Sequence, residues 1–499
     1  MNLNLTHLFA ILPLIIVGAT VVVVMLSVAF RRNHVLNATL SGIGLLLALA
    51  STVWVAQSGS VPTPVTPLLV VDNYSLLYTG LILIGALACT IFGFAYLDEF
   101  KTHRDEFYLL LLCSTLGAMV LASAIHMASL FIGLELMSVP LYGMAAYLFQ
   151  RQQSLEAGIK YMVLSAVASA FLLFGMALLF AQYGVLDFAG LGLRLVFQDA
   201  VNIWTIMGMG MMIIGLAFKL SIVPFHMWTS DVYEGAPAPV SAFLATVSKV
   251  GVFAVLVRFI VMAPTFSTRL HVVIAVLAVL SMLAGNLLAL RQKNVKRLLG
   301  YSSIAHLGYL LTAIVALRNG VANGAGELSL SGHLVLETSA VYLIAYVLTS
   351  LGSFGVVSLT ARSTQDAEGG HIDQLRGLYQ RRPALAVCMA FMLLSLAGIP
   401  LTAGFIGKFY VLGLAVNDGL WWLAGAVIIG SAIGLYYYLR TMAVLFQAPV
   451  TDVSRVVISG RGQGLGMLMV VVVSLLTLWI GVYPEPIIGL VSHALPIGL

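Results

Sequence analysis

Charged residues are scarce in this chain: of its 499 residues only 9% are Asp, Glu, Lys or Arg, whereas 61% are hydrophobic. So little charge excludes a soluble globular domain of this size. Apolar runs near twenty residues recur throughout, and each is long enough to cross about 30 Å of hydrocarbon as a helix. The alternation typical of a membrane barrel is absent. The composition therefore predicts an all-α polytopic membrane protein.

Cysteine is rare as well, since only Cys89, Cys113 and Cys388 occur and each is isolated within an apolar segment. Their spacing suits neither a disulfide framework, nor a zinc site, nor an iron–sulfur cluster. A Gly-rich loop joining a strand to a helix is also missing, so we expect the chain to bind no dinucleotide, other cofactor or metal of its own. The N-terminus lacks the basic region and cleavage site of a signal peptide, and its first apolar run is expected to remain as a span.

Fourteen membrane spans are predicted from the apolar runs. Only the neighbourhood of His126 separates the fourth from the fifth, which leaves thirteen as the alternative count. The expected spans are 7–29, 36–57, 74–97, 107–125, 127–148, 158–182, 202–228, 238–261, 271–290, 298–317, 334–360, 384–415, 419–446 and 465–484.

Two of these spans are predicted to be discontinuous, because Pro224 interrupts the seventh and Pro400, among several glycines, the twelfth. Proline frees backbone carbonyls, which are tolerated at bilayer depth only where protein or cavity water meets them. An offset of five spans reverses the direction of travel, so the breaks predict an inverted pair of five-helix repeats. The chain would then comprise a three-helix segment (1–106), a first repeat (107–261, spans 4–8), a second repeat (271–446, spans 9–13) and a C-terminal helix and tail (465–499).

The net charge of +5 comes from basic residues that lie mainly in short loops, so we interpret them as topology signals and expect no nucleic-acid partner. Sixteen basic residues fall in one alternate set of loops and three in the other, which predicts both termini on the non-cytoplasmic side. The sixteen are Arg31, Arg32, Lys101, Arg104, Arg151, Arg291, Lys293, Lys296, Arg297, Arg362, Arg376, Arg381, Arg382, Arg440, Arg455 and Arg461, and the three are Arg194, Arg269 and Arg318.

Five charges lie inside apolar segments: Glu135, Lys160, Lys219, Lys249 and Lys408. A charge at the bilayer centre costs roughly 2.5–3.5 kcal/mol on insertion scales, so five cost on the order of 12–18 kcal/mol unless they are paired or hydrated. Proton or ion transfer is the leading explanation for keeping them.

Glu135 needs a cationic partner, and Lys219 is the natural candidate. A pair whose separation changes would act as a proton switch, whereas a static buried ion pair is the alternative. Lys249, near the middle of its span, must find water or a partner inside the protein. Lys408, in the second discontinuous span, is expected to be the terminal carrier toward the outside.

Further candidates have simpler alternatives. Lys160, near the cytoplasmic start of its span, is either a relay member or a lysine that snorkels. His306 would bridge two half-pathways unless it is a packing histidine, and His226 is a relay or an interface residue. Asp231 and Glu234 form either a proton-collecting entrance or a solvated turn.

Structural explanations are available for Arg258 and for several serines of the spans. Arg258 is expected to snorkel to an interface. The hydroxyls of Ser221, Ser248, Ser302 and Ser303 either order water or bond the preceding turn of their helix.

Five ordered stretches resemble the antiporter-like subunits of bacterial respiratory complex I, in length and wording most closely subunit N. The stretches are Gly133 to Pro140, Phe218 to Trp228, Ala238 to Lys249, Lys296 to His306 and Ala397 to Lys408. One related subunit bears a glutamate in place of Lys408, and another carries a long lateral helix after the last span, so this chain departs from both.

The resemblance implies a proton-translocating subunit of the NADH:quinone oxidoreductase in the bacterial inner membrane. NADH, FMN, iron–sulfur clusters and quinone would then be bound by partner subunits, and neighbouring antiporter-like subunits would contact this chain. Glu135 and Lys219 would be the coupling pair, Lys249 the central lysine and Lys408 the terminal one, with Lys160 and His306 as further members of the polar axis.

Two alternatives stay open. A subunit of a multi-component sodium/proton antiporter or of a membrane-bound hydrogenase would use the same charges with another driving reaction. A non-conducting scaffold would use them only to specify helix packing.

Overall fold

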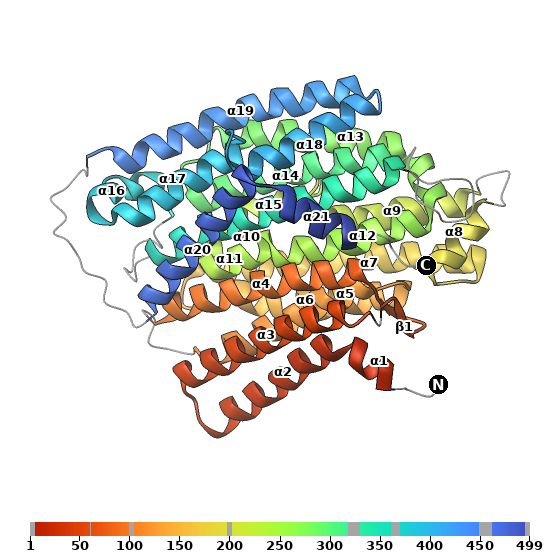
Figure 1. The fold of residues 1–499 in the computed structure, drawn as a ribbon, viewed down its shortest axis with the longest axis horizontal. Coiled ribbons are helices and arrows are strands. Elements are labelled where there is room, and N and C mark those ends of the chain that lie inside the picture. The colour runs from red at the N-terminus through yellow and green to blue at the C-terminus, as the bar shows by residue number, and fades with distance from the viewer. Residues whose placement is uncertain are drawn as a thin grey trace.

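The computed structural model describes residues 5–59, 61–98, 104–196, 202–317, 330–360, 370–448 and 462–494, and these are almost entirely helical (Figure 1). Thirteen described helical segments are long and apolar enough to cross a membrane, and the two shorter apolar helices Pro383–Ala397 and Ala403–Asn417 together make one interrupted span. The all-α polytopic fold is therefore confirmed. The fourth and fifth spans are separate helices, so the described residues give the predicted count of fourteen rather than thirteen.

The N-terminal segment is a layer of three long helices with a small hairpin. Asp72 and Ser75 form a capping box at the start of its third long helix, which fixes where the chain leaves the hairpin. The hairpin is antiparallel, with Thr63 opposite Val71. The elements are α1 (Leu5–Ala10), α2 (Leu12–Phe30), α3 (His34–Gln57), β1 (Thr63–Thr66), β2 (Leu69–Val71) and α4 (Asn73–Leu97).

The next segment contains the predicted break near Pro224 and a second break that the sequence did not predict. The second lies at Thr246, whose φ of −116° and ψ of −80° leave helical geometry. The elements are α5 (Glu106–Ser123), α6 (Met127–Ala145), α7 (Gln152–Tyr183), α8 (Phe188–Val196), α9 (Ile203–Leu220), α10 (Met227–Gly235), α11 (Ala238–Ala245) and α12 (Val247–Met262).

The last part of the chain contains the other predicted break, between α17 and α18, where Gly398 and Leu401 have φ of 85° and 69°. The elements are α13 (Pro264–Ala289), α14 (Val295–Ala316), α15 (Leu330–Thr360), η2 (Ile372–Leu375), α16 (Leu378–Arg381), α17 (Pro383–Ala397), α18 (Ala403–Asn417), α19 (Trp421–Phe446), α20 (Gln463–Val482) and α21 (Glu485–Ala494). The repeat boundaries and the inverted relation of the two segments stay predictions.

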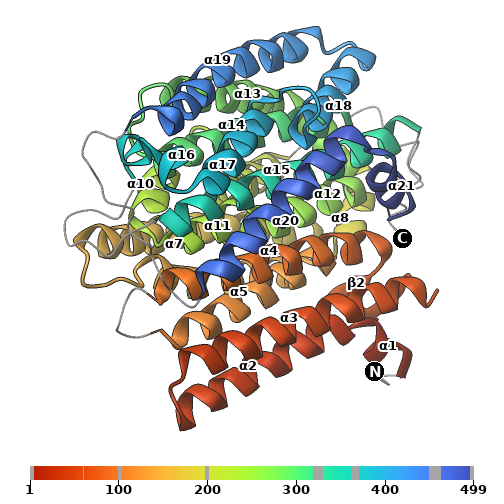
Figure 2. The same ribbon diagram turned by 60° about the vertical axis from the view of Figure 1, so that its left-hand side comes forward.

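Helix α15 lies at the centre of the bundle and packs against α4, α11, α14, α17, α18 and α20 (Figure 2). Burial separates the central spans from the peripheral ones: 94% of the apolar window is buried in α11–α12, in α14 and in α15, against 22% in α2. The central helices also carry most of the candidate site, whereas the outer helices present apolar faces suited to lipid.

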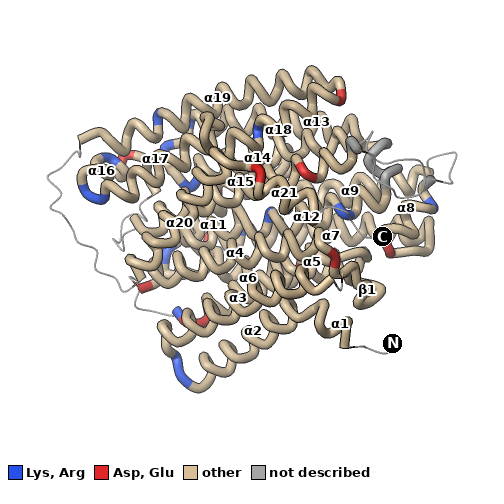
Figure 3. The backbone as a smooth tube through the Cα atoms, viewed as in Figure 1, with Lys and Arg blue, Asp and Glu red and all other residues tan. Residues whose placement is uncertain are grey.

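Basic residues gather at one end of the bundle, where α2 ends and α16 lies, while α1 and the hairpin lie at the other (Figure 3). This separation agrees with the predicted loop pattern, although the membrane side of each end stays a prediction. The predicted topology residues Lys101, Arg318, Arg362, Arg455 and Arg461 and the side chain of Arg269 lie outside the described residues. Lys296 is no loop signal: it is 2% exposed and its Nζ donates to the Ala236 carbonyl at 2.9 Å.

Candidate functional site

Glu135 on α6 and Lys219 at the end of α9 form no ion pair within 4.0 Å in the described part of the chain; serines lie beside both charges. Lys219 Nζ donates to the hydroxyls of Ser138 and Ser165, each at 2.7 Å. Glu135 Oε1 accepts from the Ser169 hydroxyl at 2.6 Å. Ser165 and Ser169 are one turn apart on α7, so that helix presents a hydroxyl to each charge. The predicted direct contact between Glu135 and Lys219 is not formed, and a separated pair is one of the two states that a proton switch would require.

Lys249 is fully buried and binds the end of the first half of the broken helix. Its Nζ donates to the backbone carbonyl of Lys219 at 3.1 Å and also contacts the hydroxyl of Ser221. The chain turns at Ser221 through a left-handed conformation with φ of 60°, which exposes the last carbonyls of α9. A cation is favourable there because the helix dipole is negative at a C-terminus. Lys249 thus finds its partner inside the protein, as expected.

Lys408 on α18 makes the equivalent contacts at the second broken helix. Its Nζ donates to the carbonyls of Leu396 and Ala397, at 3.0 and 2.9 Å, at the end of α17. Gly398 is needed beside it, because a Cβ there would lie 2.8 Å from Lys408 Cδ and its φ of 85° disfavours other residues. By its contacts Lys408 corresponds to Lys249 rather than to Lys219, since each binds the carbonyl end of an interrupted helix.

His306 on α14 has a hydroxyl near each ring nitrogen. Its Nδ1 lies 2.7 Å from the Tyr342 hydroxyl and its Nε2 lies 3.4 Å from the Tyr438 hydroxyl. Tyr438 in turn contacts Ser302, and the ring of Tyr309 lies 5.4 Å below Lys408 Nζ. A neutral imidazole can accept at one nitrogen and donate from the other, so this environment suits a relay.

The serine hydroxyls divide into two groups. Ser248 donates to the carbonyl of Leu244 in its own span at 2.8 Å, which is the predicted alternative of a hydroxyl that bonds the preceding turn. Ser221 and Ser302 contact side chains instead, and the Ser303 hydroxyl lies 2.7 Å from the Tyr346 hydroxyl. Sequence alone could not separate these groups, because the difference lies in which neighbouring helix each serine faces.

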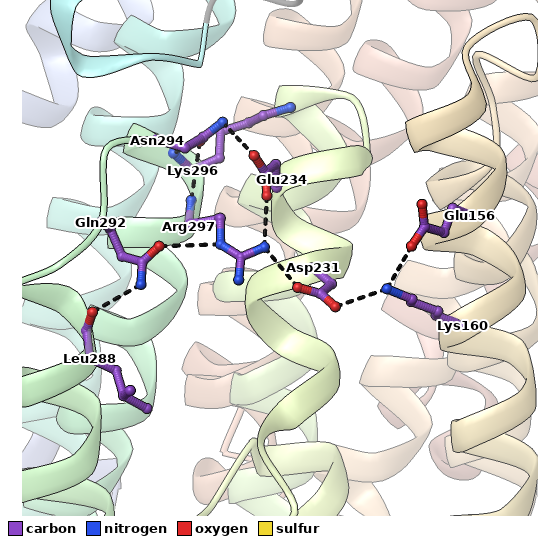
Figure 4. A network of polar contacts seen from close by, with 9 residues as sticks. All are labelled: Glu156, Lys160, Asp231, Glu234, Leu288, Gln292, Asn294, Lys296 and Arg297. Carbon is purple, nitrogen blue, oxygen red and sulfur yellow. Dashed lines mark hydrogen bonds and ion pairs between the residues drawn. The ribbon is translucent and has the colours of Figure 1, made fainter.

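A cluster of charges joins α7, α10 and α14 at the basic end of the bundle (Figure 4). Lys160 pairs with Glu156 at 2.6 Å and with Asp231 at 3.0 Å. Arg297 Nη1 lies 2.7 Å from Asp231 and 2.8 Å from Glu234. We call these five residues the entrance cluster. The side chain of Lys160 is 41% exposed, so it is a surface ion-pair member rather than a deeply buried charge.

The entrance cluster sets the charge state of Asp231. Partial burial acts to raise the pKa of this carboxyl, but Lys160 and Arg297 outweigh burial and hold the pKa below its ordinary value. Asp231 and Glu234 are therefore paired with cations from two other helices, and their role as a proton-collecting entrance stays a prediction.

His226 is not joined to these groups. It lies at the start of α10 and is 7% exposed, yet neither ring nitrogen has a hydrogen-bond partner among the described residues. Its predicted relay role stays a prediction without a contact to support it.

Arg258 corrects an expectation. Its side chain is 0% exposed and makes a two-pronged ion pair with Asp72, with both distances 2.8 Å, and it also donates to the carbonyl of Ala122. Its guanidinium lies 4.7 Å from the centre of the Tyr74 ring. Snorkelling is therefore wrong, since the partner carboxylate lies inside the protein at the start of α4.

The described residues hold no group of three or more His, Cys, Asp or Glu side chains that could bind a metal ion. The buried polar groups around the broken helices include lysines, hydroxyls and His306, which can hold or pass protons.

Comparison with known proteins gives a family and a set of related structures. Residues 124–434 match the family model described as NADH:quinone oxidoreductase/Mrp antiporter, transmembrane. A chain of respiratory complex I from Thermus thermophilus with bound aureothin is 32% identical, with a TM-score of 0.79 over 96% of this chain and 99% of that chain.

Two further structures share the fold at lower identity. A chain of the membrane-bound sulfane sulfur reductase, an archaeal respiratory membrane complex, is 22% identical, with a TM-score of 0.78 over 98% of this chain and 96% of that one. A chain of the Mrp complex from Dietzia sp. DQ12-45-1b is 20% identical, with a TM-score of 0.81 over 98% and 97%.

Proposed function

The chain belongs to the NADH:quinone oxidoreductase/Mrp antiporter transmembrane family, and from that membership we propose that it moves protons across a bacterial inner membrane as an antiporter-like subunit of respiratory complex I. Within that complex it would take the place of subunit N. NADH, FMN, iron–sulfur clusters and quinone belong in this proposal to partner subunits, and the chain contributes the proton path.

The observation that carries the proposal is the placement of Lys219 and Lys249, which are 4% and 0% exposed and have hydroxyls and a carbonyl as partners rather than carboxylates. A buried lysine without a tight counter-ion exchanges its proton more readily than one held in an ion pair. Retaining two such groups for packing alone would be costly, because apolar replacements are often neutral or stabilising.

The proton path in this proposal begins at the entrance cluster, where Asp231 and Glu234 collect protons from the cytoplasm. Lys219 takes up a proton and is stabilised in its charged form when Glu135 approaches. When the two separate, as in the present arrangement, the serines of α6 and α7 solvate both charges and the lysine gives up its proton. Lys249 receives it, and His306 and Lys408 carry it toward the outside.

The identity of the complex is tested by purification of the tagged chain from native membranes in mild detergent. Association with flavin, iron–sulfur clusters and NADH:quinone reductase activity is expected. Recovery with sodium/proton antiporter subunits or hydrogenase subunits and no flavin would assign the chain to one of those complexes instead.

Proton transfer itself is tested in vesicles that contain the intact complex. We expect Lys219→Ala and Lys249→Ala to lose most quinone-linked proton pumping, whereas Lys293→Ala, which removes an exposed lysine, should not. Each variant is compared at equal amounts of assembled complex. Normal pumping by the first two variants would favour a non-conducting scaffold.

A further inference from the structure

The hydroxyl of Tyr346 on α15 lies between the two halves of the buried polar axis. It lies 3.0 Å from the carbonyl of Ala245, the last residue of α11, and 2.7 Å from the hydroxyl of Ser303 on α14. Tyr346 is 3% exposed, and both of its partners are fully buried. One phenol therefore contacts a helix that leads to Lys249 and a helix that carries His306.

A phenol has one hydrogen, so Tyr346 cannot donate to both oxygens at once. The carbonyl of Ala245 can only accept, whereas the Ser303 hydroxyl can accept or donate. Two arrangements are therefore satisfied: Tyr346 donates to Ala245 while Ser303 donates to Tyr346, or Tyr346 turns and donates to Ser303. Rotation about one C–O bond interchanges them.

A second hydroxyl approaches the same place from the first half. Tyr233 on α10 is fully buried, and its hydroxyl has no hydrogen-bond partner among the described residues. Its ring packs beside Gly300 on α14, where an added Cβ would lie 3.4 Å from Tyr233 Cδ2, and Ser303 follows one turn later on that helix. Buried hydroxyls are rarely left unpaired, so an unpaired hydroxyl on a ring packed here indicates that a polar species binds beside it.

The other side of the junction continues into the second half. Ser303 is next to Ser302, which contacts Tyr438, and His306 follows one turn later on the same face of α14. The ring of Tyr346 lies 5.3 Å from that of His306, centre to centre. Tyr342, one turn before Tyr346 on α15, bonds the other side of the imidazole.

We propose that the Tyr346 hydroxyl hands protons from the first half of the axis to the second, with Tyr233 as the group that feeds it and Ser303 as the acceptor. This inference rests on the proposed function. In the transfer step the Tyr346 O–H bond breaks as its proton passes to the Ser303 oxygen, and Ser303 releases its former proton toward the second half of the axis. A new O–H bond forms on Tyr346 with the proton delivered by Tyr233, which takes up a replacement proton from the first half, so each of the three hydroxyls ends with one proton. Tyr346 is neutral before and after, and Ala245 holds the hydroxyl in the resting orientation.

The test is Tyr346→Phe in the intact complex, which removes the hydroxyl and keeps the ring that packs on His306. We expect coupled proton pumping to fall at least about 10-fold, because a positioned group contributes roughly 10²–10⁴-fold to proton transfer and water can replace a hydroxyl only in part. The matched control is Tyr74→Phe, which removes a buried tyrosine hydrogen bond of 2.8 Å to the Ala254 carbonyl and leaves the hydroxyl contacts of Lys219, Lys249 and His306 in place. It should pump normally.

A second test changes the proposed acceptor, Ser303, by a smaller alteration of side-chain volume. Ser303→Ala should slow pumping, and Ser303→Thr, which keeps a hydroxyl, should restore it. The ratio of pumping rates in H₂O and D₂O should rise in Ser303→Ala, because transfer across the junction becomes rate-limiting, whereas a purely structural effect would leave this ratio unchanged. If Tyr346→Phe does not assemble, this pair decides the question.

Lys219→Ala is run in parallel to separate the two hypotheses. If it abolishes pumping while Tyr346→Phe and Ser303→Ala pump at the wild-type rate, the hand-over at Tyr346 is refuted and the proposed function stands. If Lys219→Ala also pumps normally, the proposed function itself fails.

Discussion

The ion pair between Arg258 and Asp72 should make a large contribution to stability that depends on both partners. Arg258→Met keeps much of the side-chain length but leaves the Asp72 carboxylate buried without its cation. Both side chains are at most 2% exposed and are joined by two bonds of 2.8 Å. Asp72 would keep one partner, the backbone N–H of Ser75 at 2.8 Å, because that bond belongs to the helix cap.

Removing one partner of a buried pair costs about 3–5 kcal/mol, because the remaining charge is left without compensation. Adding Asp72→Asn should recover most of this loss, since the amide oxygen can still cap α4 and no charge is left buried. At about 2.1 cal/mol/K per residue, a chain of this length has an unfolding entropy near 1 kcal/mol/K. The single variant should therefore melt about 3–5 °C lower on the scale of soluble proteins.

The assay is a thermal melt in detergent followed with a thiol-reactive dye, because Cys89 and Cys388 are free and buried and become accessible on unfolding. Pumping per assembled complex should stay near the wild-type value, since the contacts of Arg258 are with Asp72, Ala122 and Tyr74 and not with the lysines of the axis. Two results would refute an uncompensated buried charge. One is an Arg258→Met variant that melts within about 1 °C of wild type, and the other is a double variant that melts no higher than Arg258→Met alone.

Three further outcomes are expected. Lys219→Ala should lose more quinone-linked pumping than Lys160→Ala, because Lys160 is 41% exposed and held by two carboxylates; equal, near-wild-type rates would overturn this ranking. Gly398→Ala should destabilise the protein by about 1–2 kcal/mol, because a left-handed backbone disfavours a Cβ and this Cβ would also crowd Lys408. An unchanged melting midpoint would contradict this expectation. Because the pKa of Asp231 is lowered in the folded protein, its carboxylate adds stability above the ordinary pKa of 3.8. This stability is lost as the pH falls through the lower, folded-state pKa. The melting midpoint should therefore decline more steeply with acid in wild type than in Asp231→Asn.

Much of the fold could be predicted from the sequence, because membrane helices must satisfy their own backbone hydrogen bonds and therefore appear as long apolar runs. The interruptions near Pro224 and Pro400 could also be predicted, since proline removes a donor. The break at Thr246 could not, because neither proline nor glycine marks it. It follows α11, a helix that packs against α15 and α4, and such contacts belong to the assembled bundle rather than to the local sequence.

The candidate site was predicted as a set of residues but not as a set of contacts. Lys219 and Lys249 are evident because charge is rare in apolar segments, whereas their serine and carbonyl partners are ordinary residues whose role depends on which helix they face. The prediction that Arg258 snorkels to an interface was wrong for the same reason, since its partner Asp72 lies 186 residues earlier in the chain. Distance along the sequence hides a partner that packing brings to 2.8 Å.

The sequence by itself determined that this chain spans a membrane many times, that two spans break, and that titratable groups lie within the bilayer, because each conclusion follows from a local cost of placing a polar group in hydrocarbon. Only the tertiary structure decided that Glu135 and Lys219 are apart, that Lys249 and Lys408 bind the ends of broken helices, and that Tyr346 touches both halves of the axis. Those facts depend on side-chain directions across helix contacts, and hydrophobic pattern alone does not specify them.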